Sequence, residues 1–168
     1  MNLNPNNWDK IWNRKYEKYN RHHQEVWDNF VKEGVTRGNI VDLGCGPCVM
    51  YEGKSISLVG VDWSEGALKQ ARLHYPCGVY IQADARNTGL PSSQFDTVIM
   101  LGLLDYFDNW PEIINEAERL RKKDGRIFAT LLRGFQDRKW TLEDVISHLN
   151  LEPKQYKRVA GPWILIEI

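Results

Sequence analysis

The residues best suited to chemistry gather in one short turn. Val41-Asp-Leu-Gly-Cys-Gly-Pro47 runs directly into Cys48. Glycines at 44 and 46 would let the backbone reverse sharply and let a ligand approach it closely. Asp42, two residues before Gly44, would repel a pyrophosphate and attract a cationic ligand. By residue type, the turn is suited to a dinucleotide, to dithiol chemistry or to a cationic ligand.

The first two of these alternatives fit the turn poorly. The dinucleotide fingerprint G-x-G-x-x-G/A requires a small residue where Val49 stands. Cys45-Gly-Pro-Cys48 matches the thioredoxin tetrapeptide, and a C-x-x-C that opens a helix favours a lowered thiol pKa. However, Gly44 rather than tryptophan precedes it, and no Ile-Pro or Val-Pro pair follows to supply a cis-proline. A regulatory disulfide between Cys45 and Cys48 stays open.

Apolar runs that alternate with helix-like periodicity predict the elements that position this turn. Residues 1–33 read as two amphipathic helices, and 37–168 as the core of a single domain. Strands are expected at 39–43, 56–61, 79–82, 95–101, 126–132, 156–159 and 163–168, and helices at 64–74, 111–122 and 141–150. The alternation predicts an α/β, doubly wound three-layer sandwich with a mostly parallel sheet. The last two strands are joined too tightly for a crossover, so one of them must run antiparallel.

The bulk composition excludes several classes of partner. Lys and Arg together number 22, as do Asp and Glu, so no overall charge attracts DNA or an anionic membrane. No apolar run reaches the length of a membrane span, and the polar first ten residues are unlike a signal peptide. Three cysteines without framework spacing favour a reducing compartment. We therefore expect a cytoplasmic protein with no DNA or membrane partner; its oligomeric state stays open.

The third alternative, a cationic ligand, is supported by a family resemblance. The sequence resembles class I S-adenosylmethionine-dependent methyltransferases over about residues 37 to 132, in the family's motif order. The matching motifs are Val41–Pro47, Val59-Gly-Val-Asp-Trp-Ser-Glu65, Ala83-Asp-Ala85, Leu90-Pro91, Phe95-Asp-Thr-Val-Ile99 and Gly125-Arg-Ile-Phe128. The resemblance implies a Rossmann-like, seven-stranded sheet in the order 3-2-1-4-5-7-6 with an antiparallel C-terminal strand. It also implies S-adenosyl-L-methionine as the cofactor, and an N-terminal helical lid over it formed by the two helices of residues 1–33.

The resemblance assigns roles at the cofactor site, with no metal. Asp62 would accept hydrogen bonds from the ribose hydroxyls, Trp63 would lie against the adenine, and Asp84 would accept from the adenine amino group. The other cofactor-binding residues expected are Ala85 by its amide, and Asp42, Gly44, Cys45, Gly46, Leu101 and Gly102 around the methionine portion. Two departures stand out: Cys48 replaces the family's third glycine, and the short 47–57 segment predicts a first helix of a single turn or an irregular one.

The methyl acceptor is less well defined by the sequence. A sulfonium is already a strong electrophile, so alignment is the main task and no fixed catalytic signature is needed. Asp105 and Tyr16 are the candidate catalytic residues, with helix capping for Asp105 and plain helix packing for Tyr16 as alternatives. No Asn/Asp-Pro-Pro-Tyr/Phe tetrapeptide of DNA amino-methylating enzymes follows the fourth strand. We expect methyl transfer by in-line displacement to a small molecule.

Two alternatives to this function remain. Residues 119–139 hold eight basic and two acidic side chains, a local excess that would suit an RNA acceptor, and a protein acceptor also stays open. The second alternative is a protein that binds S-adenosylmethionine without turnover, which the shortened first helix would favour.

Overall fold

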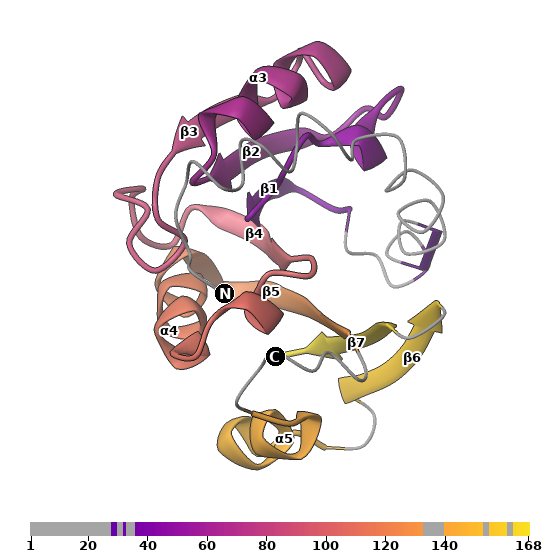
Figure 1. Cartoon of the computed structure of the whole chain (residues 1–168), viewed down its shortest axis with the longest axis vertical. Coiled ribbons are helices and arrows are strands. Elements are labelled where there is room, and N and C mark those ends of the chain that lie inside the picture. Colours follow the sequence, from indigo (N-terminus) through magenta and orange to yellow (C-terminus); the bar gives the residue numbers. More distant parts are fainter. Residues whose placement is uncertain (1–27, 30–31, 33–35, 133–139, 153–154, 161–162) are drawn as a thin grey trace.

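The strands of the chain form one sheet, which a computed structural model shows with helices on both faces (Figure 1). The structure describes residues 28–29, 32, 36–132, 140–152, 155–160 and 163–168, with the backbone alone at 157–160. Its strands are β1 (Asn39–Leu43), β2 (Ser57–Asp62), β3 (Val79–Gln82), β4 (Phe95–Met100), β5 (Arg121–Leu132), β6 (Tyr156–Ala160) and β7 (Trp163–Glu167). Its helices are α3 (Glu65–His74), α4 (Trp110–Leu120) and α5 (Leu142–Leu149), with 3₁₀ helices η2 (Val49–Tyr51) and η3 (Leu104–Tyr106).

The sheet order is β3-β2-β1-β4-β5-β7-β6. β1 pairs in parallel with β2 and β4, and β5 continues the parallel arrangement beside β4. β7 runs antiparallel to both β5 and β6. The expected α/β fold, mostly parallel with an antiparallel C-terminal strand, is confirmed. This order puts β1 and β4 side by side, so the turns that leave them form the switch point where ligands bind in such sheets.

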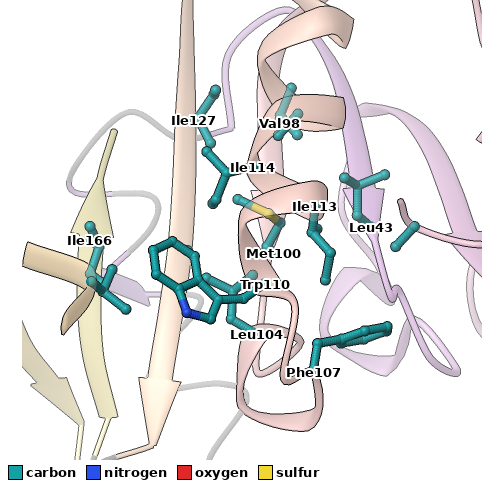
Figure 2. Close-up of a cluster of buried hydrophobic side chains, with 14 of the residues drawn as sticks. Leu43, Val98, Met100, Leu104, Phe107, Trp110, Ile113, Ile114, Ile127 and Ile166 are labelled. Atoms are coloured by element: carbon teal, nitrogen blue, oxygen red, sulfur yellow. The ribbon is translucent and has the colours of Figure 1, made fainter. Parts of the chain in front are cut away.

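Alternate residues of each strand enter two separate cores, which defines three layers. Val41 and Leu43 of β1 pack in the core beneath α4 and α5, whereas Ile40 packs on the other face with α3 and η2. Figure 2 shows the first core, in which Trp110, Ile113 and Ile114 of α4 lie among side chains of the strands. On the second face, residues of α3 and of the 3₁₀ helix η2 pack against the sheet.

Local capping explains where two helices begin. The Ser64 side chain accepts a hydrogen bond from the Ala67 amide at 3.0 Å, as expected for a helix that starts at residue 65. Thr141 and Asp144 form a complete capping box at the start of α5. Both starts agree with the sequence expectation. The two lid helices and most of residues 1–33 lie outside the described residues.

The boundary between α4 and β5 differs from the prediction. The helix ends at Leu120 rather than near Lys122, and the strand begins at Arg121 rather than at Arg126. Phe95 pairs with Arg121 and Thr97 with Arg126, so the intervening residues of β5 bulge out of the ladder. Lys122 is tied to β4 by an ion pair with Asp96 at 2.8 Å. Partners on the neighbouring strand therefore decide the conformation of this polar run.

Two further features bear on the expectations. The 47–57 segment contains only the three-residue η2, which matches the shortened first helix that the sequence predicts. No helix in the described ranges is both long and apolar enough to span a bilayer.

Candidate functional site

A cavity opens at the carboxyl edge of the parallel strands. Its walls come from the turn after β1, the ends of β2 and β3, the loop after β4, and the first residue of β7. Trp163 reaches this edge because β7 runs antiparallel to its neighbours. The lining residues are Asp42, Gly44, Cys45, Gly46, Pro47, Cys48, Val49, Met50, Asp62, Trp63, Ala83, Ala85, Leu101, Gly102, Leu103, Tyr106, Phe107 and Trp163.

The turn after β1 requires glycine at its first position. Gly44 has φ of +72°, and a Cβ there would lie 2.6 Å from Cδ1 of Leu103. The amides of Gly44 and Cys45 both donate to the carbonyl oxygen of Val61, at 2.8 and 3.0 Å. These bonds tie the turn to the end of β2. The backbone is thereby held against the cavity, with no side chain at position 44 to fill it.

Asp42 places a buried carboxylate in the wall of this cavity. Its side chain is 1% exposed, and its Oδ2 accepts a hydrogen bond from the Tyr51 hydroxyl at 2.7 Å. Oδ1 is buried and has no hydrogen-bond partner among the residues described. Burial raises the pKa of Asp42 from 3.8 to about 7; the Tyr51 hydrogen bond opposes this rise and the charge of Asp62 adds to it. An uncompensated carboxylate of this kind favours a cationic partner.

Asp62 joins the first turn to the start of α3. Its Oδ2 accepts from the Gly46 amide and its Oδ1 from the Ser64 amide, both at 2.8 Å. Each carboxylate oxygen has a second lone pair. Asp62 therefore braces the turn, and its carboxylate, a group suited to accept hydroxyl protons, lines the cavity.

Asp84 is the one predicted cofactor residue that is not part of the cavity wall. The guanidinium of Arg86 donates to both of its carboxylate oxygens, the shortest contact being 2.6 Å. Hydrogen bonds from Arg86 hold the pKa of Asp84 below its usual value, against the opposing effect of partial burial. The flanking Ala83 and Ala85 line the cavity instead. The structure thus brings Ala83 and Ala85, rather than the Asp84 carboxylate, to the site.

Asp105, a predicted catalytic residue, is also absent from the cavity wall. It is 3% exposed, and its Oδ2 accepts from the Leu132 amide at 2.9 Å, which ties η3 to the end of β5. This contact favours a structural role, although a different one from the helix cap expected as the alternative. Its neighbours Tyr106 and Phe107 line the cavity. Tyr16 lies outside the described residues, and its catalytic role stays a prediction.

Four aromatic rings line the cavity, and the sequence assigned a cofactor role to only one of them, Trp63. Tyr106, Phe107 and Trp163 complete the set. Trp163 closes on the loop after β4: a Cβ at Gly102 would lie 2.9 Å from its ring. The signal for Trp163 lay in the tight final hairpin, since a strand that runs antiparallel begins at the edge where the parallel strands end.

Cys45 and Cys48 are free, buried thiols in the cavity wall. Burial, followed by the neighbouring Cys48 thiol, raises the pKa of Cys45 well above its ordinary value. A protonated, buried thiol is a poor nucleophile, so this environment opposes dithiol chemistry. Cys48 has φ of +54°, the left-handed conformation in which glycine is the favoured residue. The methyltransferases that the sequence resembles have a glycine at this position, and Cys48 adopts a backbone conformation that suits glycine.

Comparison with known families settles the broader identity of the chain. A family model described as a methyltransferase domain matches residues 41–129, more than half of the sequence. The chain belongs to the methyltransferase-domain family. Membership and fold together imply S-adenosylmethionine as the cosubstrate.

Curated relatives of this methyltransferase domain are similar over part of their length. A ubiquinone biosynthesis O-methyltransferase of Azoarcus sp. is 30% identical over 131 residues, which cover 72% of this chain and 56% of that protein. The corresponding protein of Pseudomonas aeruginosa (strain LESB58) is 30% identical over 115 residues, 62% of this chain and 49% of that protein. The chain thus spans about half the length of the curated relatives that it matches.

Solved structures support the fold of the domain. A methyltransferase of Thermotoga maritima, described as a possible histamine N-methyltransferase, superposes with a TM-score of 0.73. The match covers 95% of this chain and 96% of that one, at 16% identity. At this identity the likeness shows the fold alone.

The residues of the cavity fit the cosubstrate that the family implies. S-adenosylmethionine carries an ammonium and a sulfonium, which suit the uncompensated Asp42 carboxylate. The glycine turn leaves room for its close approach. The aromatic rings offer flat apolar surface for an adenine base.

Proposed function

We propose that this methyltransferase domain transfers the methyl group of S-adenosylmethionine to a small-molecule acceptor by in-line displacement. The observation that carries the proposal is the buried carboxylate of Asp42, whose Oδ1 has no partner among the described residues, in the wall of an aromatic-lined cavity. Burying a carboxylate without a cation is costly. A cationic ligand in this cavity would offset that cost.

The proposed cofactor contacts run along the edge of the sheet. Asp42 attracts the cationic methionine portion, which the backbone of Gly44, Cys45 and Gly46 encloses. Asp62, at the end of β2, accepts from the ribose hydroxyls. Beyond it, Trp63 and the backbone at Ala85 contain the adenine, and Leu101 and Gly102 close the methionine end; all of these residues line the cavity.

The acceptor is proposed to lie at the β4–β7 end of the cavity. When bound, S-adenosylmethionine supplies a methyl group whose carbon forms a bond with the acceptor's lone pair as its bond to sulfur breaks, which leaves S-adenosylhomocysteine. The chain's own task is to align the acceptor atom with that carbon. Such alignment lowers the activation free energy by roughly 7–11 kcal/mol in well-oriented systems. Leu103, Tyr106 and Trp163 supply the aligning surface.

Three observations favour a small acceptor over RNA or protein. The rings of Tyr106, Phe107 and Trp163 make this wall largely apolar, a surface that suits a compact, partly apolar molecule. The curated relatives are named as O-methyltransferases of ubiquinone biosynthesis. Arg121 and Arg126, two members of the basic run at 119–139, are paired with Glu118 and Glu167, which reduces the charge available to phosphates.

Radiolabelled cofactor tests the proposal directly. Purified chain is incubated with S-adenosylmethionine labelled in the methyl group and a fractionated cell extract. Label in the low-mass fraction is the expected result, and label in RNA or protein would overturn the acceptor class. Binding without any label transfer would indicate a protein that holds the cosubstrate without turnover. Asp42→Asn serves as a matched control that retains the side-chain shape and loses the charge.

A further inference from the structure

Tyr51 lies outside the cavity wall and yet contacts its most unusual residue. It ends η2, its side chain is completely buried, and its hydroxyl donates to Oδ2 of Asp42 at 2.7 Å. Asp42 forms no ion pair within the described ranges, so the Tyr51 hydroxyl is its only favourable side-chain partner there. The proposed function uses Asp42 and gives no task to Tyr51.

We propose that Tyr51 is a positioning residue for cofactor binding, which holds Oδ2 of Asp42 and keeps this carboxylate able to ionise when a cationic cofactor enters. Uptake of the cofactor is then coupled to release of the proton from Asp42. This inference rests on the proposed function, because it takes S-adenosylmethionine to be the cation. The shortened 47–57 segment makes the contact, since η2 ends nine residues after Asp42 and packs directly beneath it.

The groups around Asp42 determine the sign of this coupling. Burial is the main effect that disfavours ionisation of Asp42, and the charge of Asp62 at the end of β2 disfavours it further. Only the hydrogen bond from Tyr51 favours the ionised form. Burial raises the pKa of Tyr51 well above its ordinary value, and the charge of Asp42 and the nearby thiols of Cys48 and Cys45 raise it further. The Tyr51 hydroxyl therefore stays protonated and remains a donor.

The result is a carboxylate that titrates in the neutral range. Its pKa of about 7 leaves Asp42 roughly half protonated at pH 7 in the free chain. A bound cation favours the ionised form, so binding releases up to about half a proton there. Affinity should rise with pH below 7 and cease to depend on Asp42 above it.

Tyr51→Phe removes the hydroxyl and leaves the ring in place. A hydrogen bond to a charged group contributes enough to move the titration midpoint upward by about one pH unit. The ionised fraction of Asp42 at pH 7 then drops from about one half to about one tenth, so cofactor affinity at pH 7 should fall about fivefold, and the deficit should shrink toward pH 9. Calorimetric titration with S-adenosylmethionine from pH 6 to 9, in two buffers of different ionisation enthalpy, measures both affinity and proton release. Titration of the cofactor's own amino group is common to all variants.

Tyr75→Phe is the matched control. Its ring packs on that of Tyr51, with centroids 6.1 Å apart, but its hydroxyl bonds Ile56 and not Asp42. Its pH profile should overlay that of the wild type. Asp42→Asn should lose the pH dependence between 6 and 8, and comparison with it isolates the proton that Asp42 releases.

Carboxyl ¹³C NMR of the free chain supplies a readout that needs no cofactor. The Asp42 signal should titrate near pH 7 in the wild type and at higher pH in Tyr51→Phe. An equal loss of affinity at every pH, or an unchanged Asp42 midpoint, would overturn the role of Tyr51. If the wild type binds no S-adenosylmethionine at any pH, the proposed function fails; the NMR midpoints still show whether Tyr51 controls the ionisation of Asp42.

Discussion

Asp42 and Asp62 lie near the ends of adjacent parallel strands, close enough for the charge of Asp62 to raise the pKa of Asp42. Asp42 accepts a hydrogen bond from the Tyr51 hydroxyl, but within the described part of the chain no Lys, Arg or His pairs with it to neutralise its charge. The free chain therefore carries an electrostatic cost in its cavity wall. That cost is the physical basis of the first prediction.

Asp42→Asn should stabilise the free chain at neutral pH. The folded-state pKa of about 7 exceeds the ordinary value of 3.8, so the folded state binds more protons than the unfolded state between these values. The free energy of unfolding of the wild type therefore falls as pH rises from about 4 to 7, by roughly 4 kcal/mol in total. Urea unfolding should give the variant and the wild type nearly equal free energies of unfolding at pH 4, and a higher value for the variant at pH 8.

The exposed Asp124→Asn provides the control for this comparison, since it removes a carboxylate from the surface. As a substitution at an exposed position, it should change the free energy of unfolding by no more than about 0.5 kcal/mol. The stability difference between Asp42→Asn and the wild type should grow between pH 4 and 8. A difference that stayed constant would contradict the raised pKa of Asp42.

Glu116→Gln should destabilise the chain at neutral pH and do so less at low pH, a dependence opposite in sign to that of Asp42→Asn. Partial burial raises the pKa of Glu116, but hydrogen bonds from Arg119 and Thr88 outweigh it and bring the pKa from 4.5 down to about 2. This stabilisation is present above pH 4.5 and is lost as pH falls toward 2. Because Arg119 is partly solvated, we expect a loss of about 2–3 kcal/mol at pH 7 in the free energy of unfolding.

Unfolding in urea at pH 7 and pH 3 checks the Glu116 prediction, and the gap between variant and wild type should narrow at the lower pH. Glu118→Gln, which removes a more exposed pair with Arg121, should change stability by less than 1 kcal/mol. An equal effect of the two variants would show that the burial of Glu116 is unimportant. The bond from the Thr88 amide also makes Glu116 an anchor of the loop that follows Ala85.

The sequence predicted best where a local signal and the tertiary fold agree. Ser64 caps α3 and Thr141 with Asp144 caps α5, both by contacts over three residues. The end of α4 was predicted wrongly because Lys122 is held by Asp96 on another strand, and no pattern within the helix reports that contact. Short-range chemistry is readable from sequence, and partners supplied by another strand are not.

The same limit applies to the candidate site. Motif positions led to Asp42, Asp62 and the glycine turn, all of which line the cavity. The partner of Asp42 is Tyr51, in a segment whose sequence gives no hydrogen-bonding signal, and Arg86 claims the carboxylate of Asp84. A family role can be carried to a position in a sequence, but the side chain's partners depend on neighbours that the motif does not include.

Asp62 and Asp84 should differ in their effect on cofactor affinity. Asp62→Ala should weaken binding by about 1–3 kcal/mol, because ligand hydroxyls would lose their acceptor. Asp84→Ala should change affinity less than threefold, since this carboxylate is bound to Arg86 outside the cavity wall. Calorimetry with S-adenosylhomocysteine measures both, with thermal unfolding to confirm that each variant is folded. A larger loss from Asp84→Ala would restore its role at the adenine.

Cys48 offers a test of backbone conformation. At φ of +54°, a left-handed residue with a side chain costs roughly 1–2 kcal/mol relative to glycine. Cys48→Gly should therefore be more stable than Cys48→Ala, although alanine is favoured over glycine at ordinary positions. The midpoints of urea unfolding of Cys48→Gly and Cys48→Ala measure this difference in stability. An alanine variant that matched or exceeded the glycine variant would exclude the left-handed turn.

The three thiols should differ sharply in reactivity. Cys77 is exposed, whereas Cys45 and Cys48 are buried. A disulfide reagent at pH 8 should modify one thiol per native chain quickly and all three in denaturant. Fast modification of two or three in the native chain would revive the redox interpretation of the turn.

The two cavity tryptophans have a consequence for how ligands can be detected. Trp63 follows β2 and Trp163 begins β7, four strand spacings away in the sheet order, or roughly 19 Å. Emission from Trp63 should therefore report the arrival of the nucleoside, and emission from Trp163 the arrival of the acceptor. The molecule carries a natural fluorophore at each end of one chamber. Because the chain has seven tryptophans in all, the part of the ligand-induced emission change that is lost in Trp63→Phe or in Trp163→Phe would report each end separately, without a dye.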